Sequence, residues 1–171
     1  MTVKINRKGS AKVEPVSDTA YTITRQFDAK PDSVFKAMTQ PQYIKRWWGF
    51  PDVEWLDCQA DLRVGGYWRN SVRGEGYEVS FHGHYREIEQ PRRLVQTEVY
   101  EGMPGGGPDV HEPGTLITTS FSLDGGVTTM HAHVECYTPE TMKAVFESGM
   151  ESGLQVSYDR IEELLPEIET R

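Results

Sequence analysis

Two pairs of histidines have the spacing that a metal site on a β-strand would use. His82 and His84 form one pair, and His131 and His133 form the other. Because alternate residues of a strand point to the same side, both rings of a pair would share one face of a sheet. In both segments the histidines alternate with the apolar residues and therefore belong to the outward, polar face. We expect a solvated surface there, and we predict no bound metal and no cofactor.

The residues that could act as nucleophiles or acids lack the partners that catalysis needs. The sequence has no Gly-x-Ser-x-Gly motif, and Cys136 follows apolar strand neighbours, where a thiol usually packs inertly. Glu98 and Glu135 show no sign of convergence, and the strand parity of Glu135 is outward. We identify no catalytic residue. An enzyme of cyclase or hydrolase type, with Asn70, Tyr85 or Glu98 as acid–base groups, stays open as an alternative.

Composition excludes several classes of protein. The chain has 171 residues, a formal net charge of −8 and 37% hydrophobic residues, which suits one globular domain. It has no basic cluster, so we expect neither nucleic acid nor a membrane as a partner. No apolar run approaches the roughly 20 residues of a membrane span, and residues 1–15 lack the apolar core of a secretory signal. Cys58 and Cys136 fit free thiols, and we expect a cytoplasmic location.

The last element that the sequence predicts is one long helix, residues 138–165. Thr138 suits the cap, Pro139 suits the first helical position, and Pro166 should end the helix. Apolar residues recur at helical spacing along one face. They are Met142, Phe146, Met150, Leu154, Tyr158, Ile161 and Leu165.

A second row on the predicted helix consists of small residues. Gly149, Gly153 and Ser157 follow at intervals of four residues. A glycine in a helix interior costs roughly 1 kcal/mol relative to alanine, so the row needs a compensating role. It either lets the helix approach a sheet closely or leaves space for a ligand, and the two roles can coexist.

The remainder of the chain alternates in the manner of strands joined by short turns. We expect strands at Ala20–Phe27, Val53–Ala60, Tyr67–Arg73, Tyr77–Ile88, Leu94–Tyr100, Thr115–Leu123 and Val127–Tyr137. Short helices are expected at 31–38 and 41–48. The order predicts an α+β fold, in which an antiparallel meander curves around the last helix and encloses a cavity. Residues 1–18 should form a flexible N-terminal arm, and residues 19–166 a single domain.

Several motifs in this order resemble those of a known superfamily. They are Phe27–Ala37, the pair Trp47-Trp48, Asp61–Arg69, Thr97–Met103 and Gly149–Arg160. Together they resemble the SRPBCC (START-like) superfamily, and within it proteins similar to the activator of heat-shock-protein-90 ATPase. The resemblance spans about Tyr21 to Leu165. It implies a helix-grip fold, with a seven-stranded curved antiparallel sheet around a hydrophobic pocket. Relatives often carry a tryptophan where Leu154 stands, a change that would enlarge or reshape the pocket.

The strand order of that superfamily bears on the histidine pairs. It would separate the two strands by two others, which puts the pairs roughly 14 Å apart. That distance is too long for both pairs to bind one ion.

The resemblance and strand parity together predict a binding site on the inner face of the sheet. The candidate ligand-binding residues are Trp48, Trp68, Asn70, Phe81, Tyr85, Ile117, Thr119, Phe121, Met130, Phe146, Gly149, Met150 and Gly153. Parity leaves the facing of Gln96 and Glu98 undecided. The same residues would also suit a solid core.

We therefore expect a module that binds a small apolar or aromatic molecule. A co-chaperone that works through its surface is a further alternative, and a homodimer stays open. The glycine- and proline-rich segment 101–114 should form a mobile flap near the pocket.

Overall fold

The computed structural model describes residues 5–102, 107–110 and 114–169. Its strands are β1 (Lys12–Pro15), β2 (Ala20–Phe27), β3 (Glu54–Ala60), β4 (Tyr67–Gly74), β5 (Tyr77–Glu89), β6 (Arg93–Tyr100), β7 (Thr115–Asp124) and β8 (Val127–Glu135). Its helices are α1 (Pro31–Thr39), α2 (Pro41–Trp47), α3 (Pro139–Glu147) and α4 (Met150–Glu169). The predicted order of elements is confirmed from β2 to β8.

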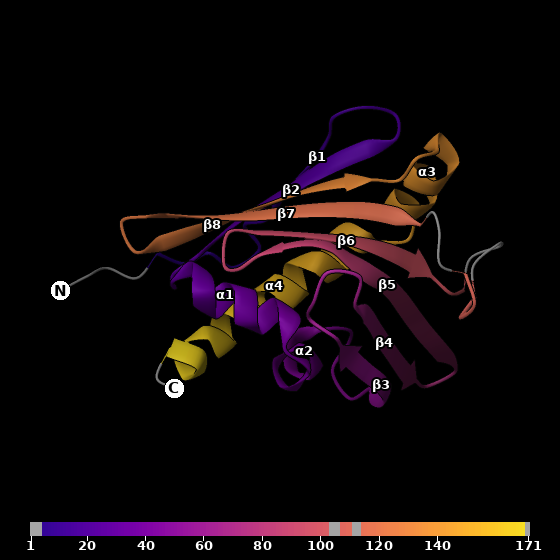
Figure 1. Ribbon diagram of the computed structural model, residues 1–171, viewed down its shortest axis with the longest axis horizontal. Coiled ribbons are helices and arrows are strands. Elements are labelled where there is room, and N and C mark those ends of the chain that lie inside the picture. Colours follow the sequence, from indigo (N-terminus) through magenta and orange to yellow (C-terminus); the bar gives the residue numbers. More distant parts are fainter. Residues whose placement is uncertain (1–4, 103–106, 111–113, 170–171) are drawn as a thin grey trace.

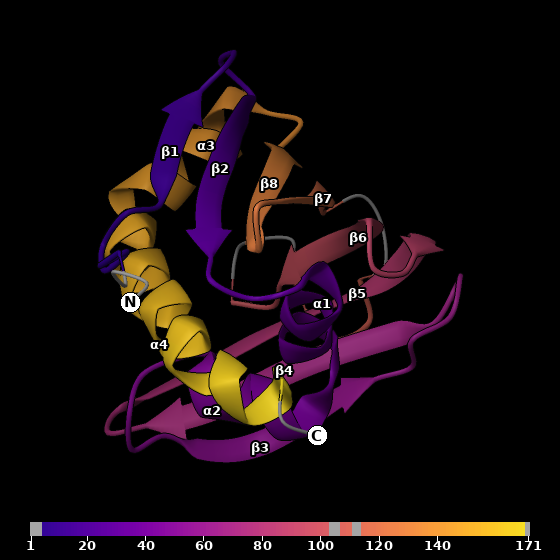
Figure 2. The same ribbon diagram turned by 90° about the vertical axis from the view of Figure 1, so that its left-hand side faces the viewer.

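All strands join one antiparallel sheet with the order β1-β2-β8-β7-β6-β5-β4-β3 (Figure 1). Figure 2 shows that this sheet curves into an open C and that α4 runs along its open side. The fold is the predicted α+β helix-grip arrangement with one strand more than expected. The additional strand is β1, which pairs with β2 from Lys12 opposite Thr24 to Pro15 opposite Tyr21. It lies in the segment that we expected to be a loose arm.

The inner face of the sheet carries the core, as strand parity predicted. Met130, Ala132 and Val134 on β8 are all buried, and so are Ile23 and Phe27 on β2. Helices α1 and α2 pack directly against α4 near one end of the sheet. The sheet and three helices therefore share one hydrophobic core.

The C-terminal segment forms two helices, so the prediction of one long helix was wrong. The oxygen Thr138 Oγ1 accepts a hydrogen bond from the Thr141 amide at 3.1 Å, which confirms the predicted cap of α3. However, α3 ends at Glu147, because Gly149 has a φ of +80°, a left-handed conformation that glycine adopts easily and that ends a helix. The predicted row of small residues is thus interrupted, and only Gly153 and Ser157 belong to α4.

Pro166 does not end α4, so the prediction that this proline ends the last helix was wrong. The helix continues to Glu169 although proline donates no hydrogen bond to the carbonyl of Glu162. Leu165 and Ile168 on either side of the proline are buried in the core. Their burial offsets the lost backbone bond, and the sequence spacing alone could not indicate this.

Candidate ligand-binding site

A buried acidic group lies on the inner face of the sheet, where the sequence left its facing undecided. Glu98 on β6 lies opposite Thr115 of β7, in line with the inward residues of the neighbouring strands. Tyr21 on β2 and Tyr158 on α4 lie close enough for the Glu98 charge to affect both phenols. Three polar side chains from three different elements thus converge on the space between the sheet and α4.

None of these three groups has a hydrogen-bond partner in the described part of the chain. Buried polar groups almost always find one, so three unpaired neighbours are unusual. Their oxygens are not among the side-chain atoms that are both unpaired and sealed from water, which are Arg7 Nε, Arg25 Nε and Glu135 Oε2. Glu98 also retains a partly accessible surface although it lies deep in the molecule. The three groups therefore border space that a water-sized molecule can reach.

Burial raises the pKa values of Glu98, of the two tyrosines and of the nearby Cys136. It raises the pKa of Glu98 to about 7, because removal from water disfavours the charged carboxylate. Burial first, and the Glu98 charge second, raise the pKa values of the Tyr21 and Tyr158 hydroxyls. Cys136 follows the same trend and has a pKa of about 11, caused mainly by burial. At neutral pH the tyrosines and the thiol are uncharged. Glu98 is present both as the neutral acid and as the carboxylate.

Aromatic side chains cover much of the remaining inner surface. The ring of Trp48 lies 5.6 Å from that of Trp55 and 5.7 Å from that of Phe81. Phe81 in turn stacks on Tyr100 at 4.9 Å. On the other side, Tyr21 and Phe146 meet edge to face at 5.2 Å. Such surfaces suit the flat apolar ligand that the sequence predicted.

The predicted ligand-binding residues separate into two groups by exposure. Those enclosed in the core are Trp68, Asn70, Tyr85, Thr119, Phe121 and Met130. Those that keep an accessible part of their surface are Trp48, Phe81, Ile117, Phe146, Met150 and Gly153. Gly149 is exposed at the junction of α3 and α4. The second group remains the candidate contact surface, and Glu98 and Tyr158 are added to it.

Gly153 on α4 bears on the two roles that the sequence left open for the glycine row. A Cβ added at Gly153 would meet no atom of the described residues within 4 Å. Gly83 on β5 behaves in the opposite way, because a Cβ there would lie 1.8 Å from the Thr97 carbonyl oxygen. Gly83 thus permits close packing, whereas Gly153 borders open space.

The prediction that both histidine pairs lie on a solvated face was wrong for His82. His131 and His133 are exposed, but His82 is 0% exposed. Its Nδ1 lies 2.9 Å from Glu101 Oε2, and its Nε2 contacts the carbonyl oxygen of Val110. The segment after β6 therefore covers this part of the outer face, which strand parity could not indicate.

Glu101 also binds Arg69 on β4, whose Nε and Nη2 each donate to a carboxylate oxygen at 2.9 Å. These bonds hold the pKa of Glu101 below its usual range. We expect Glu101→Gln to lower the free energy of unfolding by about 1.5–3 kcal/mol, because hydrogen bonds to charged groups contribute that much. A urea titration measures the change.

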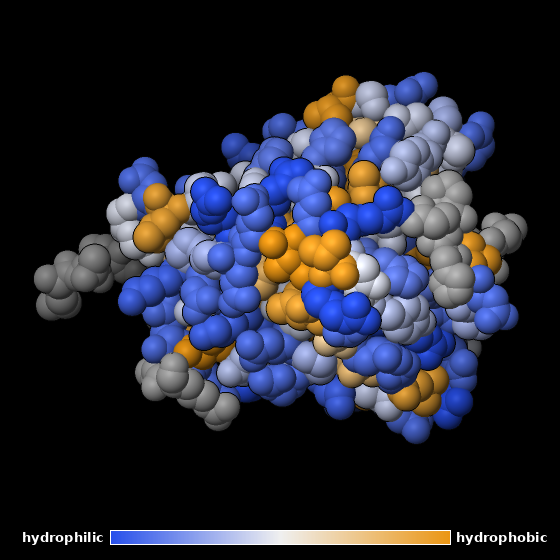
Figure 3. Space-filling model, in the orientation of Figure 1, coloured by the Kyte–Doolittle hydropathy of each residue, from blue (hydrophilic) through white to orange (hydrophobic). Residues whose placement is uncertain are grey.

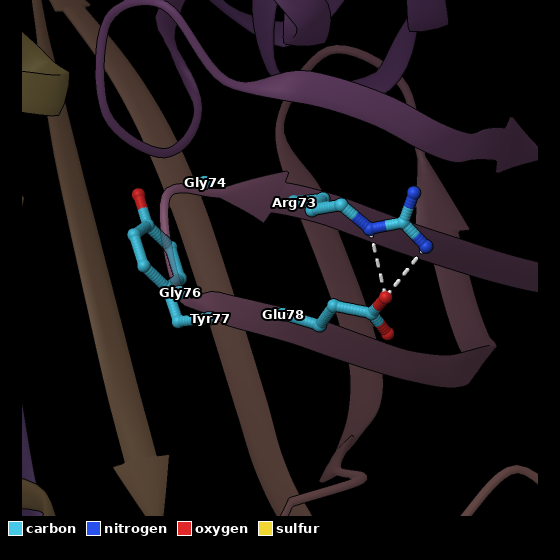
Figure 4. A pocket seen from close by; sticks show the side chains of 5 residues that line it. All are labelled: Arg73, Gly74, Gly76, Tyr77 and Glu78. Atoms are coloured by element: carbon cyan, nitrogen blue, oxygen red, sulfur yellow. Dashed lines mark hydrogen bonds and ion pairs between the residues drawn. The ribbon is translucent and has the colours of Figure 1, made fainter.

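The control for this prediction is an exposed pair of the same type. Arg73 donates to Glu78 across the β4–β5 hairpin at 2.9 and 2.7 Å, as Figure 4 shows. Exposed pairs contribute about 0–1 kcal/mol. Glu78→Gln should therefore cost less than Glu101→Gln, and equal losses would contradict a structural role for the buried network.

Two hollows lie elsewhere on the described surface. One of about 360 Å³ lies at the β4–β5 hairpin, beside Gly74, Gly76 and Tyr77 (Figure 4). The other, of about 500 Å³, lies between residues 5–8 and the C-terminal half of α4. Neither includes Glu98. We favour the inner surface because, in the described part of the chain, it combines unpaired polar groups with accessible aromatic rings.

The described residues contain no group of three or more His, Cys, Asp and Glu side chains placed to hold a metal ion. His111 and the rest of 111–113, with 103–106, lie outside the described residues, and so does half of the predicted flap. Among the helices that the structure describes, none is long and apolar enough to cross a membrane.

The family model described as activator of Hsp90 ATPase homolog 1-like protein matches residues 28–166. A crystal structure from Rhodobacter sphaeroides is similar, with 26% identity, a TM-score of 0.78, and coverage of 91% of this chain and 97% of that chain. A solution structure from Arthrobacter aurescens has 25% identity and a TM-score of 0.75, with 91% of each chain covered.

The AHSA1-like protein from Aeromonas hydrophila shares the fold at 19% identity and a TM-score of 0.61, with 83% of this chain and 92% of that chain covered. A search of curated proteins gave no match. The family model covers most of the chain, and the fold agrees with it. The chain therefore belongs to the activator of Hsp90 ATPase homolog 1-like family, within the SRPBCC superfamily.

Proposed function

We propose that this protein binds a small, mostly apolar molecule between the curved sheet and α4. The observation that carries the proposal is the open space at Gly153, together with aromatic and aliphatic side chains of the inner surface that are only partly buried. Apolar side chains in a tightly packed core touch protein on all sides. Here Phe146, Met150 and Leu154 pack against the core and yet keep accessible surface. A ligand would cover it.

Substitution of Gly153 tests this proposal. We expect Gly153→Leu to leave the free energy of unfolding unchanged or to raise it by up to about 0.8 kcal/mol, since leucine favours helices more than glycine. The same side chain would occupy the ligand space. Binding of the neutral dye N-phenyl-1-naphthylamine should therefore weaken by about tenfold, measured by fluorescence titration.

A matched control uses the exposed side of the same helix. Val156 is 50% exposed on α4. Val156→Leu should change neither dye binding nor stability by a measurable amount. If Gly153→Leu instead lowered stability by about 1–3 kcal/mol, the glycine would be a packing residue. If the wild-type protein did not bind the dye, the proposed ligand site would be rejected.

One observation favours an enzyme as a second candidate function. A carboxyl group with a pKa of about 7 can both accept and donate protons at neutral pH, which is what general acid–base catalysis requires. Among the acid–base groups named from the sequence, only Glu98 combines this property with unpaired phenols nearby. Turnover of a bound ligand that disappears in Glu98→Gln would support this candidate.

A further inference from the structure

The ligand class can be narrowed from the charges around Glu98, and this step rests on the proposed function. An ionised carboxylate buried in protein is costly unless a cation or several hydrogen bonds compensate it. No ion pair and no hydrogen bond involves Glu98 in the described part of the chain. Burial alone raises the pKa of its carboxyl group. The carboxylate is therefore uncompensated in the protein by itself.

Among the described residues, the elements around Glu98 supply no positive charge to it. β2 contributes Tyr21, α4 contributes Tyr158, and the residue after β8 is Cys136, all of them neutral groups. Arg25 on β2 is a buried cation of the core, but it is already paired. Its Nη2 donates to Asp159 at 3.1 Å. A ligand that reaches Glu98 thus meets a negative charge among aromatic rings.

We infer that the ligand carries a basic amine, whose N–H donates to Glu98 while its apolar body lies against the inner aromatic surface. A protonated amine supplies the charge that the protein lacks at this point. The faces of aromatic rings also attract cations, so the surrounding side chains favour the same group. A carboxylate or phosphate at this position would instead meet the like charge of Glu98. The inner surface should therefore select cations over anions of the same shape.

Three naphthalene compounds of matched shape test the inference. They are 2-naphthylmethylamine, which is a cation at pH 8, 2-naphthylmethanol, which is neutral, and 2-naphthoate, which is an anion. Each is titrated against the protein loaded with N-phenyl-1-naphthylamine. We expect the amine to bind at least tenfold more tightly than the alcohol, and the carboxylate to bind most weakly. Glu98→Gln should reduce amine binding to the level of the alcohol and change alcohol binding by less than about threefold.

The control variant is Glu87→Gln, on an exposed part of β5, which should change none of the three affinities. Lowering the pH from 8 to 5.5 protonates Glu98 and should remove the preference for the amine in the wild type. Equal binding of amine and alcohol, or a preference that survives in Glu98→Gln, would overturn the inference while leaving the proposed function intact. Failure of the dye and all three compounds to bind would reject the proposed function itself.

Discussion

Glu98→Gln should stabilise the protein by about 3 kcal/mol at pH 8 and leave its stability nearly unchanged at pH 4. The pKa of Glu98 is about 7 in the folded protein, against 4.5 for an exposed glutamate. Because one pKa unit corresponds to about 1.4 kcal/mol, the difference amounts to about 3 kcal/mol. The folded state binds the proton more tightly than the unfolded state does. Stability is therefore lost as the pH rises from 4.5 to 7, and glutamine avoids this loss.

Urea titrations at a series of pH values would measure this effect. The stability of wild type relative to Glu98→Gln should fall between pH 4.5 and 7 and stay constant above pH 8. Glu87→Gln serves as the control, because Glu87 lies on the surface and pairs with Arg93. Its effect should stay within about 0.5 kcal/mol at every pH. Destabilisation by Glu98→Gln at pH 8 would contradict an uncompensated carboxylate at this position.

The second large effect is expected at the buried ion pair between β2 and α4. Arg25 is 1% exposed and pairs with Asp159 at 3.1 Å. Asp159→Ala leaves the guanidinium without this partner in the core, which typically costs 3–5 kcal/mol. The carboxylate also accepts the Gly9 amide at 3.0 Å, so the segment before β1 would be released as well. Thermal and urea unfolding of the variant measure the loss.

Two further variants show whether the loss of stability in Asp159→Ala comes from the unpaired charge of Arg25 or from lost side-chain packing. Asp32→Ala breaks an exposed pair with Lys36, and should cost no more than about 1 kcal/mol. The double variant Arg25→Met with Asp159→Leu removes both charges and should recover most of the stability that Asp159→Ala loses. If the double variant were as unstable as Asp159→Ala, lost packing rather than an unpaired charge would explain the effect.

Strand parity predicted the inner surface well wherever only one face of a strand is apolar. On β8, Met130, Ala132 and Val134 alternate with polar residues, and all three are buried as expected. β6 is different, because Leu94 on one face and Val95 on the other are both buried. The facing of Glu98 was therefore undecidable from the sequence, which named it only as an acid–base group of the enzyme alternative and not as a ligand-binding residue.

The two other errors have different causes. The sequence pattern places His82 on the surface, but Val110 and Glu101, which lie far away in the chain, cover it. Gly149 has the spacing of a residue in a helix interior, but its positive φ ends α3 there. A glycine can adopt either conformation, so spacing alone does not separate the two.

The outer surface of the molecule bears on the co-chaperone alternative. Figure 3 shows that hydrophilic residues cover most of the viewed face and that hydrophobic residues gather near its centre. A group of exposed apolar residues can mark an interaction surface. The co-chaperone alternative therefore stays a proposal beside the ligand site on the inner face.

The additional strand β1 has a consequence for aggregation. An open sheet exposes unpaired backbone groups at both edges, and such edges can join the sheets of other molecules. At one edge β1 covers half of β2 and presents only four residues, among them the exposed Lys12, Glu14 and Pro15. Charges and a proline of this kind discourage further pairing. A short N-terminal strand thus protects a sheet that must stay open to curve around its helix.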